Sequence, residues 1–386
     1  MQLDHVRSQF TELFGKGEAA AFHSPGRVNL IGEHTDYNGG YVFPCALTLG
    51  TYGITRTTDT GRLRLASANF GASVVEISLD GIEPNAQPMW TNYPLGVVRE
   101  FQKLGQPLGG LDLLVAGDLP NSAGLSSSAS VEVLMGVVLN DLFGCGLGMV
   151  EIAKLAQRAE NLFVGVNCGI MDQFAIAMGR RDNAVLLNCK NLEYRYIPAA
   201  LDGHCLVISN TNCPRGLAGS KYNERRGQCE AAVEMLREEL DISLLGEVSP
   251  AEYEAHKHLI TDDLIRRRAE HIVYETQRTK DAADSLSRGD LAAFGKHMNA
   301  SHESLANLFE ITGSELDALA YAAQRQDGVR GSRMTGGGFG GCTVSLVEEA
   351  HVESFKHNVG ASYRAATGIT PDFYIANIGS GAGRIG

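Results

Sequence analysis

Polar residues crowd the end of a short apolar strand near the amino terminus. Residues 24–40 read SPGRVNLIGEHTDYNGG, so a strand ends in five consecutive hydrogen-bonding residues and then in Asn-Gly-Gly. Such a loop presents donors and acceptors to a polyhydroxylated ligand. A polar turn in which Asn-Gly supplies positive φ is an equally good interpretation, and Arg27 is then a surface cation. The candidate ligand-binding residues of this run are Glu33, His34, Thr35 and Asp36.

A serine-rich segment precedes a nearly all-apolar helix. Residues 119–130 read LPNSAGLSSSAS, in which Gly124 permits a tight turn and three serines then open the helix. The free N–H groups and positive dipole end of a helix form an anion site, to which serine hydroxyls add phosphate or metal contacts. A serine N-cap is the alternative, but one serine satisfies it. The Gly-Lys-Ser/Thr signature is absent, so a phosphate site here belongs to another kinase architecture.

Two carboxylates, Glu160 and Asp172, stand where they could serve such a site. Glu160 lies about 80° from the middle of the apolar stripe of a helix predicted over 149–164. From that edge it can reach a neighbouring helix start and a magnesium ion bound to phosphates. Asp172, in CGIMDQF, begins a further helix just after Gly169. From these residues alone, compensation of the helix dipole is the better interpretation of Asp172.

A glycine-rich segment, RMTGGGFGGCTVSLV at 333–347, contains Gly-x-Gly-x-x-Gly at 336–341. That pattern suggests a dinucleotide-binding loop, but a strand follows it here instead of a helix, and no acid is clearly placed about 20 residues later. The glycines around Phe339 instead indicate a backbone that approaches a ligand or another strand closely.

The elements that must position these segments change character along the chain. The first half predicts strands over 19–30, 41–56, 62–68, 73–79 and 111–116 in a largely antiparallel sheet, then helices over 129–143 and 149–164. Further strands are predicted near 184–189 and 204–210. The second half predicts long amphipathic helices over 219–240, 261–287, 290–309 and 313–325, a strand at 342–348, a helix over 351–366 and a last strand at DFYIANI. We predict two α+β lobes, 1–200 and 201–386.

The composition excludes several classes of function. The chain has 386 residues, 44% hydrophobic and 20% charged, with a formal net charge of -12. That charge argues against nucleic acid as a partner, though not against ATP, which a few oriented amides can hold. Eight cysteines without a Cys-x-x-Cys pair indicate neither zinc nor a dithiol site. An amphipathic N-terminal helix and the lack of 18 consecutive apolar residues predict a cytoplasmic protein without membrane contact.

Taken together, these segments resemble the GHMP kinase superfamily, and specifically the galactokinases. GRVNLIGEHTDYN is similar to the galactokinase signature loop, GLSSSAS to the phosphate-binding motif of the superfamily, and TGGGFGG to its third motif. CGIMDQ, AEN at 159–161 and SKYNERRGQC at 220–229 are also similar to galactokinase segments, so the resemblance covers nearly the whole chain. One residue departs from the pattern, since the family usually has Gly where this chain has Ser122.

The resemblance implies a two-lobed GHMP-kinase-like fold, with mixed and antiparallel sheets, helices and an active site between the lobes. It implies ATP-dependent phosphorylation of α-D-galactose at the anomeric hydroxyl, in galactose catabolism, with Mg²⁺ and no obligate protein partner. Asp172 is implied to be the catalytic base and Arg27 to stabilise the transition state, with Ser128 and Glu160 as metal ligands. The implied sugar-binding residues are Glu33, His34, Thr35, Asp36, Gly169 and Tyr222. The implied ATP-binding residues are Ser122, Ala123, Gly124, Leu125, Ser126, Ser127 and Ser128. Trp90 is a candidate neighbour of the adenine, although a lone Trp equally suits the core.

Three alternatives stay open at this point. Another sugar kinase of the family would act on N-acetylgalactosamine, arabinose or galacturonate, and pocket shape alone separates these substrates. A non-catalytic sensor of galactose is disfavoured by the intact GLSSSAS, Arg27 and Asp172. A nucleotide-binding oxidoreductase is disfavoured because no strand–loop–helix surrounds the glycine motif.

Overall fold

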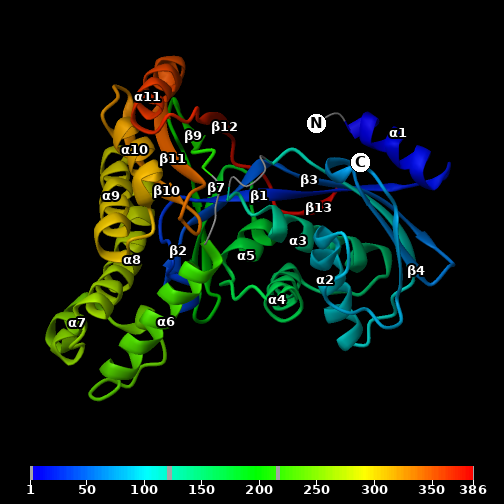
Figure 1. Cartoon of the computed structure of the whole chain (residues 1–386), viewed down its shortest axis with the longest axis horizontal. Coiled ribbons are helices and arrows are strands. Elements are labelled where there is room, and N and C mark those ends of the chain that lie inside the picture. Colours follow the sequence, from blue (N-terminus) through cyan, green and yellow to red (C-terminus); the bar gives the residue numbers. More distant parts are fainter. Residues whose placement is uncertain (1–2, 120–123, 214–217, 386) are drawn as a thin grey trace.

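The chain forms two lobes that meet along the first strand (Figure 1). The computed structural model describes residues 3–119, 124–213 and 218–385, apart from the side chains of 218–220. The first lobe is built on a six-stranded sheet in the order β13-β1-β3-β6-β4-β5. Its strands are β1 (Ala20–Asn29), β3 (Pro44–Thr58), β4 (Arg62–Ser67), β5 (Val75–Ser78), β6 (Gly110–Gly117) and β13 (Gly383–Arg384). Neighbours are antiparallel except β4 and β6, which run parallel.

Helices cover both faces of this sheet. On one face, α1 (Leu3–Phe14) buries Val6, Phe10 and Phe14 against the strands. The other face carries α2 (Asn92–Lys103), α3 (Ser127–Leu142), α4 (Met149–Ala159) and α5 (Met171–Met178), which form the largest apolar core with the sheet. Figure 1 shows α1 above the sheet and α2 to α4 below it. The helix α3 has apolar residues on most sides because it is enclosed by the sheet, α2, α4 and α5.

The second lobe packs helices against an antiparallel sheet in the order β10-β11-β9-β12. Its strands are β9 (His204–Asn210), β10 (Val329–Thr335), β11 (Cys342–Glu348) and β12 (Asp372–Ala376). Its helices are α6 (Ala218–Leu236), α7 (Pro250–His256), α8 (Asp263–Ser287), α9 (Leu291–Ser304), α10 (Gly313–Gln324) and α11 (Val352–Thr367). A short sheet of β2 (Tyr41–Val42), β7 (Asn183–Asn188) and β8 (Tyr194–Pro198) lies beside both lobes.

One continuous apolar core ties the lobes together. Val28, Ile31 and Phe43 from the first lobe pack in the same cluster as Phe294 and Val344 from the second. The helix α9 lies so close to β10 that a methyl group on Gly295 would come within 2.0 Å of the Arg330 carbonyl oxygen. Because a packed interior resists deformation, this core holds the end of β1 rigidly against the second lobe.

The predicted elements correspond closely to those observed, with instructive exceptions. The helix predicted over 149–164 ends at Ala159, and Glu160–Val164 form a single π-helical turn. The sequence patterns do not predict α2, whose first turn contains Pro94, or the two-turn helix α7. Proline is tolerated in the first helical turn, because the N–H that it lacks has no intrahelical partner there.

Two further observations bear on the predicted organisation. The division at residue 200 falls between β8 and β9 and stays a prediction, but β13 returns the end of the chain to the first sheet, beside β1. Within the part of the chain that the structure describes, no helix combines the length and apolar character needed to cross a bilayer.

Candidate active site

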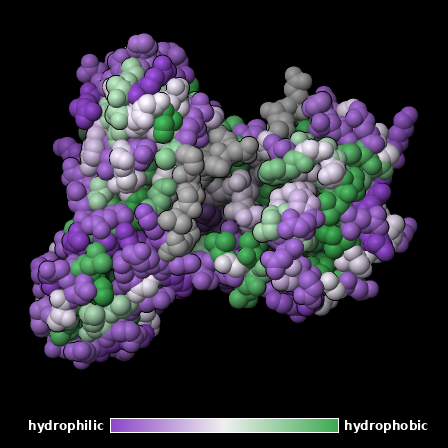
Figure 2. Space-filling model, in the orientation of Figure 1, coloured by the Kyte–Doolittle hydropathy of each residue, from purple (hydrophilic) through white to green (hydrophobic). Residues whose placement is uncertain are grey.

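A cavity of about 450 Å³ opens between the two lobes. Figure 2 shows the molecule hollowed at this waist. Segments far apart in the sequence line it: the loop after β1, the start of α3, the stretch from Glu160 into α5, the start of α6 and the glycine-rich loop. The predicted site residues that line it are Arg27, Glu33, His34, Asp36, Gly124, Leu125, Ser126, Ser127, Ser128, Glu160, Gly169, Asp172 and Tyr222. Ser122 and Ala123 lie outside the described residues.

Arg27 and Asp172 form a two-pronged ion pair in this cavity. Arg27 Nε donates to Asp172 Oδ1 and Arg27 Nη2 to Oδ2, both at 2.7 Å, while Nη1 donates to the Gly124 carbonyl oxygen at 2.7 Å. The Arg27 side chain is 5% exposed and that of Asp172 is 28% exposed, so the carboxylate faces the cavity. Burial opposes the charge on Arg27, but Asp172 outweighs it and raises the pKa of the guanidinium. Asp172 therefore does more than compensate a helix dipole, and Arg27 is not a surface cation.

The serines at the start of α3 do not act as a simple cap. Ser126 occupies the N-cap position with a left-handed φ of 62°, and its side chain makes no capping hydrogen bond. Its hydroxyl instead donates to Asp172 Oδ2 at 2.5 Å. Ser127 and Ser128 follow in the first turn and line the cavity. The start of α3 thus turns its hydroxyls toward the Asp172 carboxylate and the open space.

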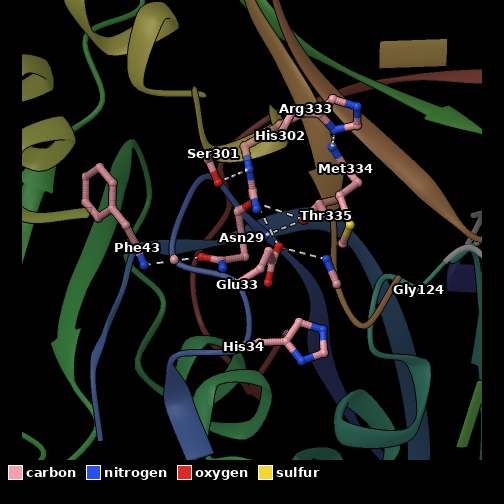
Figure 3. A network of polar contacts seen from close by, with 12 residues as sticks. Asn29, Glu33, His34, Phe43, Gly124, Ser301, His302, Arg333, Met334 and Thr335 are labelled. Atoms are coloured by element: carbon pink, nitrogen blue, oxygen red, sulfur yellow. Dashed lines mark hydrogen bonds and ion pairs between the residues drawn. The ribbon is translucent and has the colours of Figure 1, made fainter. Parts of the chain in front are cut away.

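The loop after β1 fixes Glu33 and His34 in different ways. Glu33 Oε1 accepts hydrogen bonds from the Gly336 amide at 2.8 Å and from Arg333 Nη1 at 3.3 Å (Figure 3). His34 Nε2 lies 3.3 Å from the Gly337 carbonyl oxygen and Nδ1 lies 2.8 Å from the Tyr37 hydroxyl. Because a carbonyl only accepts, these partners assign the proton to Nε2. Burial, with His271 nearby, lowers the pKa of His34 to about 3, so the ring is neutral.

Thr35 is the predicted sugar-binding residue that the structure places away from the cavity. Its side chain is fully buried, and its hydroxyl lies within hydrogen-bond distance of the Gly32 and Tyr41 carbonyl oxygens, at 2.9 and 2.7 Å. Thr35 is not among the residues that line the cavity. A side chain held in this way shapes the loop that carries its neighbours.

Asp36 and Gly169 are packed against each other. A methyl group on Gly169 would come within 1.9 Å of Asp36 Oδ2, so only glycine leaves room for this carboxyl group. Burial, and then the charge of Asp172, raise the pKa of Asp36 to about 7. The site therefore holds two acids of unlike environment side by side, one paired with Arg27 and one largely desolvated.

An aromatic wall closes the cavity from α6. The ring centroid of Tyr222 lies 5.1 Å from that of His34 and 5.4 Å from that of Tyr37. Tyr222 is partly buried and lines the cavity, whereas Cys229, Val233 and Leu236 on the same stripe of α6 lie in the apolar core. Burial raises the pKa of the Tyr222 phenol well above its ordinary value, so the hydroxyl stays protonated.

Glu160 belongs to a buried acidic cluster at the far end of the cavity. The amide of Gln173 donates to Glu160 Oε2 at 2.6 Å and to Glu132 Oε2 at 3.1 Å. Ser128, in the first turn of α3, lines the same cavity. Burial raises the pKa of both carboxyl groups. Glu160 opens the π-helical turn, a local widening that often occurs at functional sites.

A second, smaller cavity of about 170 Å³ lies on the other side of Ser127 and Ser128. Its walls are largely aromatic and apolar, and include Phe70, Trp90, Tyr93 and Val115. Trp90 is half-buried and packs against the core of the first lobe. The two cavities thus share the start of α3.

Sequence reasoning misses the partners that hold these side chains. Gln173 follows Asp172 directly, but only the fold brings Glu132 to it. Arg333 stands in the quoted glycine-rich segment, yet its contact with Glu33 spans 300 residues. The same strand also carries Arg330, so the sequence of β10 holds no signal that singles out Arg333.

Comparisons with known proteins agree with this geometry. Residues 8–57 match the galactokinase galactose-binding signature, residues 92–180 the GHMP kinases N terminal domain and residues 282–365 the GHMP kinases C terminal domain. The chain is 51% identical over 387 residues to a galactokinase of Fusobacterium nucleatum, covering 99% of this chain and 100% of that protein. It is 52% identical to a galactokinase of Clostridium acetobutylicum, covering 99% of each.

Solved structures show the same correspondence. The Lactococcus lactis galactokinase complexed with galactose superposes with a TM-score of 0.97 at 45% identity, covering 99% of this chain and 100% of that chain. The Methanococcus jannaschii mevalonate kinase gives a TM-score of 0.67 at 19% identity, covering 95% and 100% of the two chains, and shares the fold.

The raised pKa of Asp36 predicts a pH-dependent contribution to stability. In the unfolded chain this carboxyl group ionises near 3.8, and in the fold near 7, so the fold favours the protonated form. The favourable contribution is complete below about pH 4 and is lost as the pH rises toward 7, by an amount on the order of 1–4 kcal/mol. Urea unfolding of the wild type and Asp36→Asn between pH 5 and 8 measures it. We expect the difference in free energy of unfolding between the two proteins to change up to about pH 7 and then level off. A difference that is independent of pH would contradict the raised pKa of Asp36.

Proposed function

The chain belongs to the galactokinase family and transfers a phosphoryl group from ATP to galactose, and on that premise we propose how the cavity divides this work. The Arg27–Asp172 pair carries the proposal, because it stands between the polar loop after β1 and the serine-rich start of α3. The sugar binds on the side of the loop and the phosphates bind at the helix start. The product is α-D-galactose 1-phosphate.

Asp172 acts as the base that receives the proton of the anomeric hydroxyl. A sugar hydroxyl is too weak an acid to ionise unaided at neutral pH, and a carboxylate within hydrogen-bond reach takes its proton. Among the described residues, Oδ2 of Asp172 already accepts from Arg27 and Ser126, whereas Oδ1 accepts from Arg27 alone. A carboxylate oxygen offers about two acceptor positions, so Oδ1 is the atom that we assign to the sugar hydroxyl.

Arg27 neutralises charge at the point of transfer. Its guanidinium is pinned by Asp172 and the Gly124 carbonyl, so no reorganisation is needed when negative charge builds up on the transferring group. A planar fork makes three such contacts at fixed angles, which a lysine cannot reproduce. Phosphoryl transfer depends mainly on such positioning and charge stabilisation.

The sugar is held by Glu33, His34 and Asp36 from the loop, with Gly169 and Tyr222 opposite. Asp36 can donate to the hydroxyl groups when protonated and accept from them when ionised. Both ring nitrogens of His34 already have protein partners, so a sugar hydroxyl would exchange with one of these. The Tyr222 ring provides an apolar wall of the kind that ligand cavities combine with a few polar groups. For Thr35, the contacts support a role in shaping the loop and not in touching the sugar.

The ATP phosphates bind the segment 122–128, where free amides and hydroxyls at the start of α3 favour an anion. Mg²⁺ in nucleotide sites is bound by one or two protein oxygens together with substrate phosphates. Ser128 and Glu160 both line the cavity and offer a hydroxyl and a carboxylate oxygen that fit that requirement. When bound there, the ion would offset charge on the phosphates.

The adenine occupies the smaller cavity beyond Ser127 and Ser128. Its aromatic wall, with Trp90 and Tyr93, suits stacking of a planar base.

A dependence on ATP also supports placing the enzyme in the cytoplasm, and we assign it no obligate protein partner.

Galactose should be preferred strongly over its epimers. Glucose differs in the orientation of one hydroxyl, and entry of the wrong epimer leaves buried polar groups unpaired, at roughly 1–3 kcal/mol each. We expect about 10- to 10⁴-fold higher kcat/KM for galactose than for glucose in a coupled ADP-release assay. The same assay is run with N-acetylgalactosamine, arabinose and galacturonate as the other candidate substrates. Equal use of glucose, or a preference for another sugar of the panel, would contradict the assignment; binding without turnover would indicate a sensor.

Asp172→Asn should abolish turnover while ATP binding survives. The amide keeps the shape of the side chain but cannot take a proton, so kcat should fall by at least roughly 10²–10⁴. Galactose 1-phosphate formation and ATP titration calorimetry measure the two effects. Asp141→Asn, on the exposed end of α3, is the matched control and should leave both unchanged. Retention of more than about a tenth of the activity would exclude Asp172 as the base.

Glu160→Gln should raise the magnesium concentration that gives half of the maximal rate. Removing a residue that only hydrogen-bonds to a metal ligand already lowers metal affinity roughly 10–100-fold, and removing a ligand should lower it at least as much. The rate is measured against free Mg²⁺ at saturating galactose. Glu151→Gln on the exposed face of α4 is the control, because its carboxylate pairs only with Lys154 among the described residues. An unchanged requirement in a folded Glu160→Gln protein would remove Glu160 from the metal site.

A further inference from the structure

The segment that carries Glu33 is bound to the second lobe by hydrogen bonds along its length. The Gly32 amide donates to Glu275 Oε1 at 3.0 Å, and the Glu33 carbonyl oxygen lies 3.2 Å from His271 Nε2. Arg333 Nη1 donates to the Asn29 carbonyl oxygen at 3.1 Å and to Glu33 Oε1 at 3.3 Å. Every one of these partners comes from α8 or β10, so the geometry of the loop is set from outside its own lobe.

The two ends of this attachment are joined to each other. Ser301, on α9, donates from its hydroxyl to Glu275 Oε1 at 2.5 Å and accepts from Arg333 Nε at 3.2 Å (Figure 3 shows the contact with Arg333). Glu275 is in addition paired with Arg278. We call Glu275, Ser301 and Arg333 the buried triad. Their side chains are fully buried, as is that of Glu33 at 1% exposure.

The charges in this buried region are well defined. Burial opposes ionisation of Glu275, but Arg278, His271 and Arg333 outweigh it and lower its pKa to about 2. Burial lowers the pKa of His271 to about 4, so this ring is a neutral donor to the Glu33 carbonyl. A guanidinium stays protonated in proteins. Arg333 thus lies as a cation between the Glu275 carboxylate and the carboxyl group of Glu33.

We propose that Arg333, held by Ser301 and Glu275, is a positioning residue that fixes one oxygen of Glu33 and so directs the other toward a sugar hydroxyl. The proposal rests on the role of Glu33 in galactose binding given above. Oε1 of Glu33 is occupied by Arg333 and the Gly336 amide, while Oε2 receives no hydrogen bond from any described residue. Glu33 also lines the cavity. Among the described residues, Oε2 is therefore the oxygen left for a ligand.

Stability alone does not account for this arrangement. Replacing a buried ion pair by well-packed apolar side chains is often neutral or stabilising, so the triad is poor evidence for a purely structural role. The planar guanidinium of Arg333 contacts a carbonyl, a hydroxyl and a carboxylate at the same time, and its fixed geometry orients the Glu33 carboxyl group. A carboxylate held in advance in its binding geometry loses less freedom when the sugar binds.

Arg333→Lys tests the proposal because it keeps the charge and removes the fork. Galactose Kd is measured by titration calorimetry, with kcat, KM for ATP and thermal unfolding recorded on the same protein. We expect galactose Kd to rise about tenfold while KM for ATP stays within about twofold. Ser301→Ala, an uncharged and smaller change in the same network, should raise galactose Kd in the same direction by a few fold. Arg330→Lys is the matched control on the same strand, since that side chain is 42% exposed and pairs with Glu348.

A double-mutant cycle separates positioning from general damage. Glu33→Gln should itself raise galactose Kd, and adding Arg333→Lys to it should raise Kd by less than twofold further, because both changes disable one contact. If the fold increases in galactose Kd of the two single variants multiply in the double variant, the proposal is overturned. It is also overturned if Glu33→Gln binds galactose more weakly while Arg333→Lys and Ser301→Ala bind it as tightly as the wild type. If Arg333→Lys does not fold, Ser301→Ala in the same cycle decides. Unchanged affinity in Glu33→Gln would instead refute the role of Glu33 given above, and the positioning role with it.

Discussion

The structure depends on keeping several carboxyl groups close together in a partly buried space. Glu33, Asp36, Glu160 and Asp172 line the cavity, and Glu132 stands behind it. Like charges in a low-dielectric region repel strongly, so each group needs a cation, hydrogen bonds or a proton. Arg27 serves Asp172 and Arg333 serves Glu33, whereas burial raises the pKa of Asp36, Glu132 and Glu160. The two buried arginines are therefore as essential to the site as the acids.

That requirement explains why the site lies between lobes. Arg27 is on β1 and Asp172 is on α5, both in the first lobe, while Arg333 is on β10 in the second. The apolar core shared by the lobes brings Val28 and Val344 into one cluster, and this fixes the end of β1 against β10. The loop after β1 is thus held from both sides, and its Glu33, His34 and Asp36 line the cavity.

Most of the architecture follows from the sequence, because it depends on local patterns, and most of the residues proposed for the site line the cavity. Periodicity places α3, α8 and β11 correctly, and the family resemblance selects the carboxylates and Arg27. What the sequence cannot give are contacts between distant residues of ordinary type. Ser126 stands at an N-cap position but bonds Asp172, the Thr35 hydroxyl contacts the Gly32 carbonyl oxygen, and Arg333 reaches Glu33 across 300 residues. These outcomes depend on which lobe surfaces meet, which no short pattern encodes.

The same electrostatics show how an acidic protein accommodates ATP. The net charge of -12 is spread over the molecule, and exposed charges more than about 10 Å away are largely screened at physiological salt. In the site that we propose, the phosphates respond instead to what lies within a few ångströms, which is the start of α3, its serine hydroxyls and Arg27. The buried acids nearest to that helix start, Glu132 and Glu160, are the ones whose ionisation burial opposes. Burial thus disfavours negative charge on the acids nearest to an incoming triphosphate, and a bound cation would lessen the repulsion from them further.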